Sequence, residues 1–182
     1  MTKARDLASA GSAFAAVDST ELGYLDGVTS AIQTQINTKA NSSLPTLTAP
    51  ILISPEERMT VSAIAATGTI NFDASTQGVL YYTTNASGNW TLNVRGTSSA
   101  TLNSILATGD AITVSFFAAQ GGTAFRHTAL TIDGNAQTVL WSGGTAPTSG
   151  NTSGTDIYAF TIIKTAATPT YTVFGAGPIK YA

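Results

Sequence analysis

The sequence predicts a mainly β protein, with a short N-terminal helical stem followed by a C-terminal antiparallel β-sandwich of jelly-roll type. Three observations lead to this prediction. Short runs rich in Val, Ile, Thr, Tyr and Phe recur from residue 59 onward, separated by turns rich in Gly, Asn and Asp. Residues 17–40 carry the start and stop signals of helices. Charged residues make up only 10% of the chain, against roughly 25% in ordinary soluble domains.

The predicted sandwich covers residues 59–182. Several of its runs alternate apolar and polar residues, as in residues 90–94 (WTLNV), which turns one face of the strand toward a core. Many short strands at such spacing are typical of sandwiches, jelly rolls and barrels. A short helical turn is expected at Leu102–Leu106. The expected strands are Thr60–Ala65, Gly68–Asp73, Val79–Thr84, Asn89–Val94, Ala111–Ala118, His127–Ile132, Thr138–Trp141, Asp156–Lys164 and Thr170–Gly175.

Residues 17–40 are the predicted stem. Asp18 is placed to cap a helix, with Glu21 three residues later in a capping-box arrangement, and Val17 can pack on Leu22 across that cap. Gly27 occupies a position typical of a helix end, so two short capped helices are expected rather than one rod.

The stem also carries a narrow apolar seam. Isolated helices shorter than about 12–15 residues are marginal in water, so a seam of this kind needs a partner. We expect that partner to be the same seam on sister chains, which makes this a trimerisation stem. The alternative is an amphipathic helix lying on its own β-domain. In one heptad frame, the a and d positions hold Leu22, Leu25, Ile32 and Ile36.

The segments on either side of the stem differ in character. Residues 1–16 are rich in Ala, Ser and Gly, and are expected either to lack a fixed structure or to become ordered on docking to a larger partner. Residues 41–58 contain three prolines at five-residue intervals, which exclude helix and central strand and predict an extended linker. The candidate docking residues are Lys3, Arg5, Asp6 and Leu7.

The composition argues against several classes of function. The net charge is −2 and no basic run occurs, so a nucleic-acid partner is not expected. No apolar run approaches the roughly 18 residues that a membrane span needs. The charged N-terminus lacks the apolar core of a signal peptide, so synthesis in the cytoplasm and release by lysis are expected.

No catalytic or metal-binding set is visible either. The chain has one histidine, His127, and no cysteine, so the usual zinc and nucleophile sets cannot form. His127 is expected on a strand surface or between subunits. The carboxylates Asp73, Asp110, Asp133 and Asp156 fall mostly at turns, where Asp serves the backbone. A glycosidase would need two of them across a cleft. We therefore expect a protein without enzymatic activity, cofactor or metal.

The aromatic residues offer one candidate ligand contact. Trp90 is expected in the core because its neighbours Leu92 and Val94 share its face of the strand. Trp141 borders the long Ser/Gly/Thr-rich loop 142–154 and is the best candidate for an exposed ring that contacts a glycan.

The stem resembles a known element. Residues 20–40 (TELGYLDGVTSAIQTQINTKA) closely resemble a segment of tail-fibre-like proteins of tailed bacteriophages, in which it forms a trimeric stalk and is often repeated. Residues 55–58, 81–85 and 89–96 look like virion structural proteins of marine phages, notably those that infect cyanobacteria. Here the stem segment occurs once, which implies a short fibre rather than a long one.

The resemblance implies a non-enzymatic virion protein that forms a short homotrimeric fibre on the head or tail. Residues 1–16 would dock onto other virion proteins, and residues 59–182 would form a distal knob for host adsorption. Two alternatives remain open: a capsid decoration protein that braces the shell, and a carbohydrate-binding module that contacts a host-surface glycan.

Overall fold

A computed structural model describes residues 20, 24, 28, 51 and 53–182 of the protein. The chain divides into two units, Met1–Ile53 and Ser54–Ala182. In the first unit, the Tyr24 amide donates to the Thr20 carbonyl at 3.3 Å, which is the spacing of one α-helical turn. Residues 53–58, at the end of the predicted linker, contain neither helix nor strand. Two sets of predicted residues lie outside the described part: the docking residues Lys3, Arg5, Asp6 and Leu7, and the trimerisation residues Leu22, Leu25, Ile32 and Ile36.

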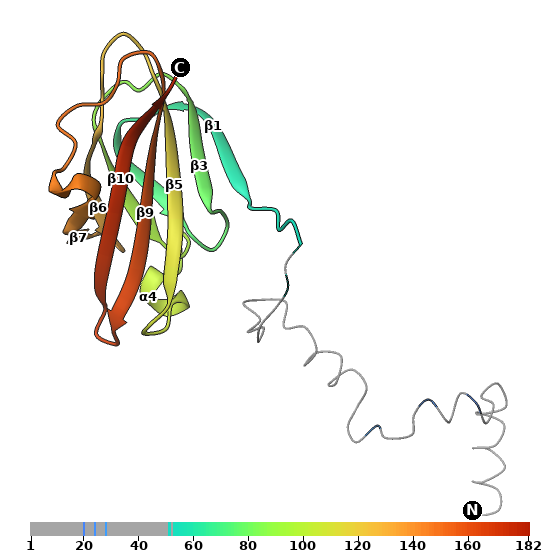
Figure 1. The fold of residues 1–182 in the computed structure, drawn as a ribbon. Coiled ribbons are helices and arrows are strands. Elements are labelled where there is room, and N and C mark those ends of the chain that lie inside the picture. Colours follow the sequence, from blue (N-terminus) through green and yellow to red (C-terminus); the bar gives the residue numbers. More distant parts are fainter. Residues whose placement is uncertain (1–19, 21–23, 25–27, 29–50, 52) are drawn as a thin grey trace, which may run out of the picture. The chain divides into compact units, whose positions relative to one another are not determined.

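The second unit is a sandwich of two β-sheets (Figure 1). One sheet has six strands in the order β1-β3-β5-β9-β10-β8, and the other has four in the order β2-β4-β6-β7. The mainly β prediction is therefore confirmed. The strands are β1 (Met59–Ala65), β2 (Gly68–Asp73), β3 (Val79–Thr84), β4 (Trp90–Arg95), β5 (Ala111–Gln120), β6 (His127–Ile132), β7 (Asn135–Gln137), β8 (Val139–Trp141), β9 (Gly154–Ala166) and β10 (Thr170–Tyr181).

The predicted strands are all present. β2, β3 and β6 have the predicted bounds, whereas β9 and β10 extend further than predicted. The short strand β7 was not predicted, because Asp133-Gly134-Asn135 reads as a turn without an apolar run behind it. It pairs with β6 through a tight hairpin, with Gly134 at φ 82°.

The topology corrects the antiparallel jelly-roll prediction. From β1 to β6 the chain alternates between the two sheets, so strands within a sheet run parallel: β1 with β3, β3 with β5, β2 with β4, and β4 with β6. Antiparallel pairs occur at β5–β9, β9–β10 and β6–β7. A strand in the opposite sheet serves as the crossover that parallel pairing requires. Side-chain alternation identifies the buried face of a strand but not its neighbours, so the sequence did not reveal this winding.

The core between the sheets is aromatic at its centre. Trp90, on β4 and predicted to be buried, is 1% exposed. Its ring packs edge-on against Phe116 of β5 at 5.6 Å and Tyr158 of β9 at 5.8 Å, so these contacts join the two sheets. Phe72, Leu92 and the other inward residues surround this cluster.

The helical turn predicted at Leu102–Leu106 is present as α4 (Leu102–Ile105). It is held at both ends by side chains from other elements. The Asp133 carboxylate accepts hydrogen bonds from the Leu102 amide at 2.7 Å and the Asn103 amide at 3.2 Å. The buried Lys164 ammonium donates to the Asn103 and Leu106 carbonyls at 3.0 and 2.7 Å. An anion at the N-terminus and a cation at the carbonyl end match the helix dipole.

Candidate functional site

His127, which was expected on a strand surface or between subunits, lies inside the sandwich of a single chain. At the start of β6, the register with β4 shifts between Trp90 and Thr91, and Thr128 fills the irregularity by donating its hydroxyl to the Trp90 carbonyl at 2.9 Å. This irregularity turns His127 inward, where only 2% of it is exposed. Alternation alone cannot reveal a bulge, which explains the wrong prediction.

The surroundings of His127 are aromatic. Its ring lies 5.0 Å from that of Phe160, 5.7 Å from Tyr158 and 5.8 Å from Trp141. Among the described residues, no hydrogen bond of good geometry reaches either ring nitrogen, and the nearby Ala129 backbone only partly favours the charged form. Burial lowers the pKa of His127 to about 4, since the charged form loses its solvation. A neutral, enclosed imidazole of this kind is part of the core.

Trp141 is half-buried rather than freely exposed. Its ring packs against His127 and, at 5.8 Å, against Phe160. It also lines a shallow depression of about 410 Å³ with Leu140, Phe174 and their neighbours. Contact of Trp141 with a glycan stays a prediction.

The carboxylates of the sandwich each have a structural partner. Asp73 forms an ion pair with Arg95 at 2.6 Å. Asp110 accepts from the Ala107 amide at 2.8 Å, and Asp133 holds α4. The buried Asp156 accepts from the Asn151 amide and side chain at 2.9 and 2.7 Å. Among the described residues, no three His, Asp or Glu side chains are grouped so that they could hold a metal.

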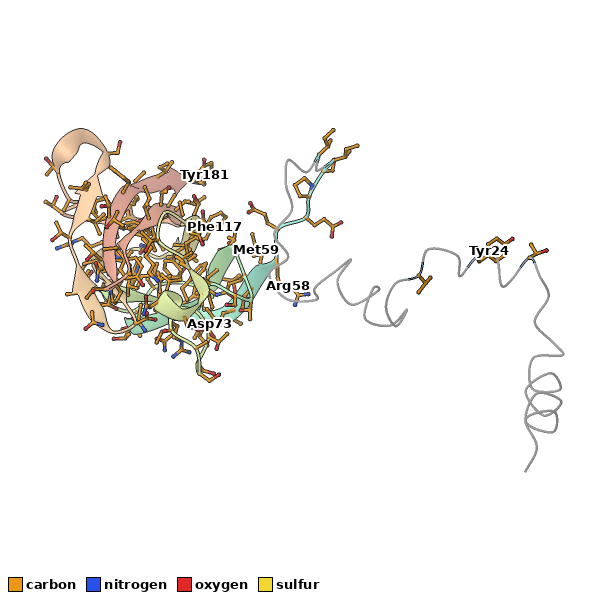
Figure 2. All side chains as sticks on the ribbon, turned by 90° about the horizontal axis from the view of Figure 1, so that it is seen from below. Tyr24, Arg58, Met59, Asp73, Phe117 and Tyr181 are labelled. Carbon is orange, nitrogen blue, oxygen red and sulfur yellow. The ribbon has the colours of Figure 1, made fainter. Side chains whose placement is uncertain are left out.

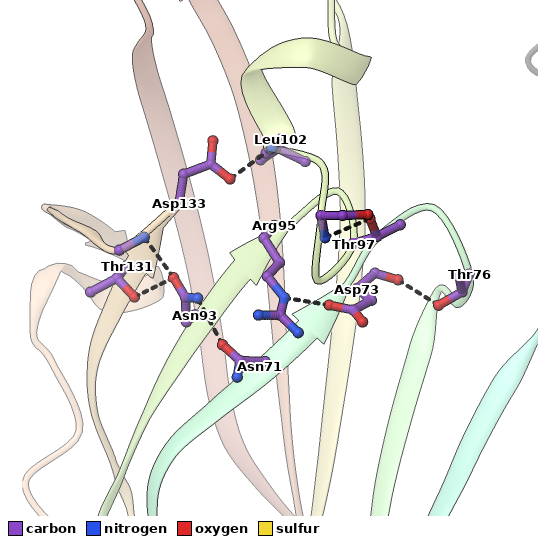
Figure 3. A network of polar contacts seen from close by, with 11 residues as sticks. Asn71, Asp73, Thr76, Asn93, Arg95, Thr97, Leu102, Thr131 and Asp133 are labelled. Carbon is purple, nitrogen blue, oxygen red and sulfur yellow. Dashed lines mark hydrogen bonds and ion pairs between the residues drawn. The ribbon is translucent and has the colours of Figure 1, made fainter.

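The outer face of the four-stranded sheet is polar and hydrogen-bonded along its rows. The Asn93 amide group donates to Asn71 Oδ1 at 2.8 Å, and its oxygen accepts from the Thr131 hydroxyl at 2.8 Å and the Gly134 amide at 2.9 Å. The Arg95–Asp73 pair forms the next outward row of β4 and β2. Figure 3 shows this network crossing the strands. We call this surface the polar face.

Replacement of Asn93 by alanine should remove the centre of this network. Three hydrogen bonds are lost from a partly buried position, so we expect the free energy of unfolding to decrease by about 1–2 kcal/mol. Urea denaturation of the full-length protein would measure the change. Thr91→Val, two residues earlier on the same face, keeps a β-branched side chain and should change stability by less than about 0.5 kcal/mol. Equal effects for the two variants would contradict this account.

The outer face of the six-stranded sheet has the opposite character. Register places Val61, Tyr81, Phe117 and Ile157 in one row across β1, β3, β5 and β9, and pairs Ile179 of β10 with Ile157. The Tyr81 and Phe117 rings pack edge-on at 5.9 Å. Parallel rows add Met59 and Val79 on one side, and Phe174 and Leu140 on the other. We call this surface the apolar face.

The outward positions of the apolar face hold no charged side chain, because the register places Asp156, Lys164 and Lys180 of β9 and β10 on the other side of the sheet. Its outward positions also hold Ala111, Thr113, Ser115, Ala159, Thr161, Ile163, Thr172 and Ala176, and none of these side chains ionises. Figure 2 labels three residues of this face, Met59, Phe117 and Tyr181. Its most exposed apolar residues are Met59 (44%), Val61 (62%), Leu140 (51%), Phe174 (47%), Ile179 (51%) and Tyr181 (59%).

Sequence reasoning missed the apolar face, although a signal for it exists. β5 (AITVSFFAAQ) contains the uninterrupted apolar run 116–119, and β9 (GTDIYAFTIIKTA) contains the runs 157–160 and 162–163, where strict alternation would place polar residues. Near-continuous apolar strands are typical of sheets that are buried on both sides. The core covers only one side of these strands within a single copy of the sandwich.

Comparison of the chain with protein-family models, curated proteins and solved structures found no match. Within the described part of the chain, no helix has the length and apolar character that crossing a membrane would require.

Proposed function

We propose that this chain is a non-enzymatic structural protein that forms a short homotrimeric fibre in the virion of a tailed bacteriophage. The observation that carries the proposal is the unlike chemistry of the two outer faces of the sandwich. An uncharged apolar face and a hydrogen-bonded polar face suit a module that forms one wall of a larger assembly. The resemblance of residues 20–40 to phage stalk segments suggests that this larger assembly is a trimeric phage fibre.

In this proposal the parts of the chain have separate tasks. Residues 1–16 dock onto other virion proteins, and residues 17–40 set the threefold symmetry. The sandwich is the projecting part, which presents three copies of its loops to a host surface. Three weak contacts made together gain avidity without a tight pocket in any one copy. The protein reaches the virion in the host cytoplasm and leaves the cell by lysis.

The oligomeric state tests the first step of this proposal. Size-exclusion chromatography with light scattering should give the full-length protein a mass three times the 18.6 kDa of one chain. A Leu25→Asp, Ile32→Asp double variant places charge in the stem seam and should dissociate at concentrations at which the natural protein stays trimeric. A natural chain that is monomeric across the micromolar range would overturn the proposal.

The place in the virion needs a separate measurement. Gold-labelled antibodies against the sandwich, seen by electron microscopy on intact particles, should mark projections from the head or tail. Label lying flat and evenly over the shell would favour a decoration protein that braces the capsid.

A further inference from the structure

We infer that the apolar face of the six-stranded sheet is the surface through which the sandwiches of sister chains meet. This inference rests on the proposed homotrimer and names a second contact within it, separate from the helical stem. The occupant of the face is another copy of this chain.

The first argument is the cost of leaving the face in water. Burying apolar surface is favourable by about 25 cal/mol per Å², and exposed apolar patches beyond a few hundred Å² are uncommon in monomers. The row from Val61 through Phe117 to Ile179 crosses five strands without a charged side chain. Charged side chains are the common means of keeping an exposed sheet from associating, and the outward positions of this face carry none; Lys180 of β10 is exposed but shares a register pair with the inward Asp156.

The second argument is size. Six strands about 4.8 Å apart span roughly 24 Å, and ten residues of β5 at about 3.3 Å each give a length of roughly 33 Å. The face therefore offers at most about 800 Å² per copy, which is what a stable interface buries on each partner. In a trimer each copy divides this area between two neighbours. The sheet contact alone is then small, and it needs the stem to hold the copies together.

The third argument concerns which partner fits. A surface whose outward positions hold no charge offers no charge pattern for a charged partner to match, whereas a second copy presents the same chemistry. The stem, once trimeric, tethers three sandwiches by the linker of residues 41–58, whose extended reach is at most about 60 Å. Tethering raises the local concentration of the other copies far above that of a free partner. The polar face, whose hydrogen bonds are satisfied within one copy, then remains outward.

The depression beside Trp141 belongs to the same surface. Leu140, Phe174 and Thr161, which line it, lie on the apolar face. In the trimer a side chain of a neighbouring copy would occupy it. Binding of a sugar in this depression and contact with a sister chain there would therefore exclude one another.

Single thiols test the inference directly, because the natural chain contains no cysteine. Phe174→Cys places a thiol on the apolar face, and Ala129→Cys places one at an exposed position on the polar face. In the full-length trimer, we expect the first thiol to react with a polyethylene-glycol maleimide at least tenfold more slowly than the second. In urea the two rates should become equal.

A charged substitution gives a second readout. Ile157→Lys at the centre of the apolar face should raise the concentration at which the trimer dissociates at least tenfold, and Thr91→Lys on the polar face should leave it unchanged. Circular dichroism of both variants would verify that the sandwich is folded. If Ile157→Lys fails to fold, the milder Phe174→Asp at the exposed part of the face replaces it.

The outcomes separate the two proposals. A trimer in which both thiols react equally fast overturns the sheet contact and leaves the stem trimer intact. A monomer with two freely reactive thiols overturns both. A monomer in which the Phe174→Cys thiol is protected also overturns the inference, because the face is then covered by something other than a sister chain.

Discussion

Replacement of Trp90 by alanine should lower the free energy of unfolding by about 3–5 kcal/mol, the largest effect expected of any single side chain in the sandwich. Trp90 is 1% exposed and touches rings from the opposite sheet. Its removal leaves a cavity where the sheets meet, and rigid strands on both sides cannot close it. Urea denaturation of the full-length protein, followed by far-ultraviolet circular dichroism, would measure the loss.

Two further variants make this prediction specific. Trp90→Phe keeps most of the ring volume and removes an indole N–H that has no hydrogen-bond partner among the described residues. It should therefore lower the free energy of unfolding by only about 1–2 kcal/mol. Trp141→Ala removes a half-buried ring at the edge of the core and should cost less than Trp90→Ala. An equal loss from both tryptophans would mean that the core is not centred on Trp90.

The stability of the sandwich should also fall with acid through His127. The imidazole has a pKa of about 4 in the folded protein and 6.5 when exposed. Between these values the unfolded chain binds a proton that the folded chain does not, so stability rises with pH in this window. The contribution is complete above about pH 6.5, decreases as the pH falls and is lost near pH 4. It amounts to about 3 kcal/mol.

The matched variant is His127→Phe. Because the chain has a single histidine, the difference between the natural protein and this variant isolates its titration from that of the carboxylates. Urea midpoints at half-unit steps from pH 4 to pH 7.5 should show the natural protein losing more stability than the variant on acidification. Parallel curves for the two proteins would show that His127 is solvated in the folded state.

The sequence predicted strand positions well and strand neighbours poorly. β4 illustrates the first point, since Trp90, Leu92 and Val94 alternate with Thr91 and Asn93, and the structure buries the first set. Alternation is a local property, and it records which side of the strand meets the core. Pairing depends on where the chain goes next, and the connection between Ala65 and Gly68 could in principle close a hairpin or cross to the other sheet. Here it crosses.

The candidate surfaces were harder to predict than the core. Trp141 was predicted to be exposed because it borders the Ser/Gly/Thr-rich loop 142–154. In the structure its ring packs against His127. The apolar face includes Phe117 and Ile157, which sequence analysis placed within expected strands without a direction for their side chains. Their outward direction emerges only when the strands are set in register, because Phe116 and Tyr158 beside them point inward.

The winding of the chain between the sheets has a consequence for the order in which the protein can fold. From β1 to β6 no two consecutive strands pair with each other, so no hairpin can form in this part of the chain. The longest local pairing is the hairpin of β9 and β10, and β9 is also the partner of β5. Non-local pairings slow folding because the chain loses loop-closure entropy before the stabilising contacts between the strands have formed. In the proposed trimer, residues 17–40 would leave the ribosome before the sandwich can close, and sister chains would have time to meet through them before their strands pair.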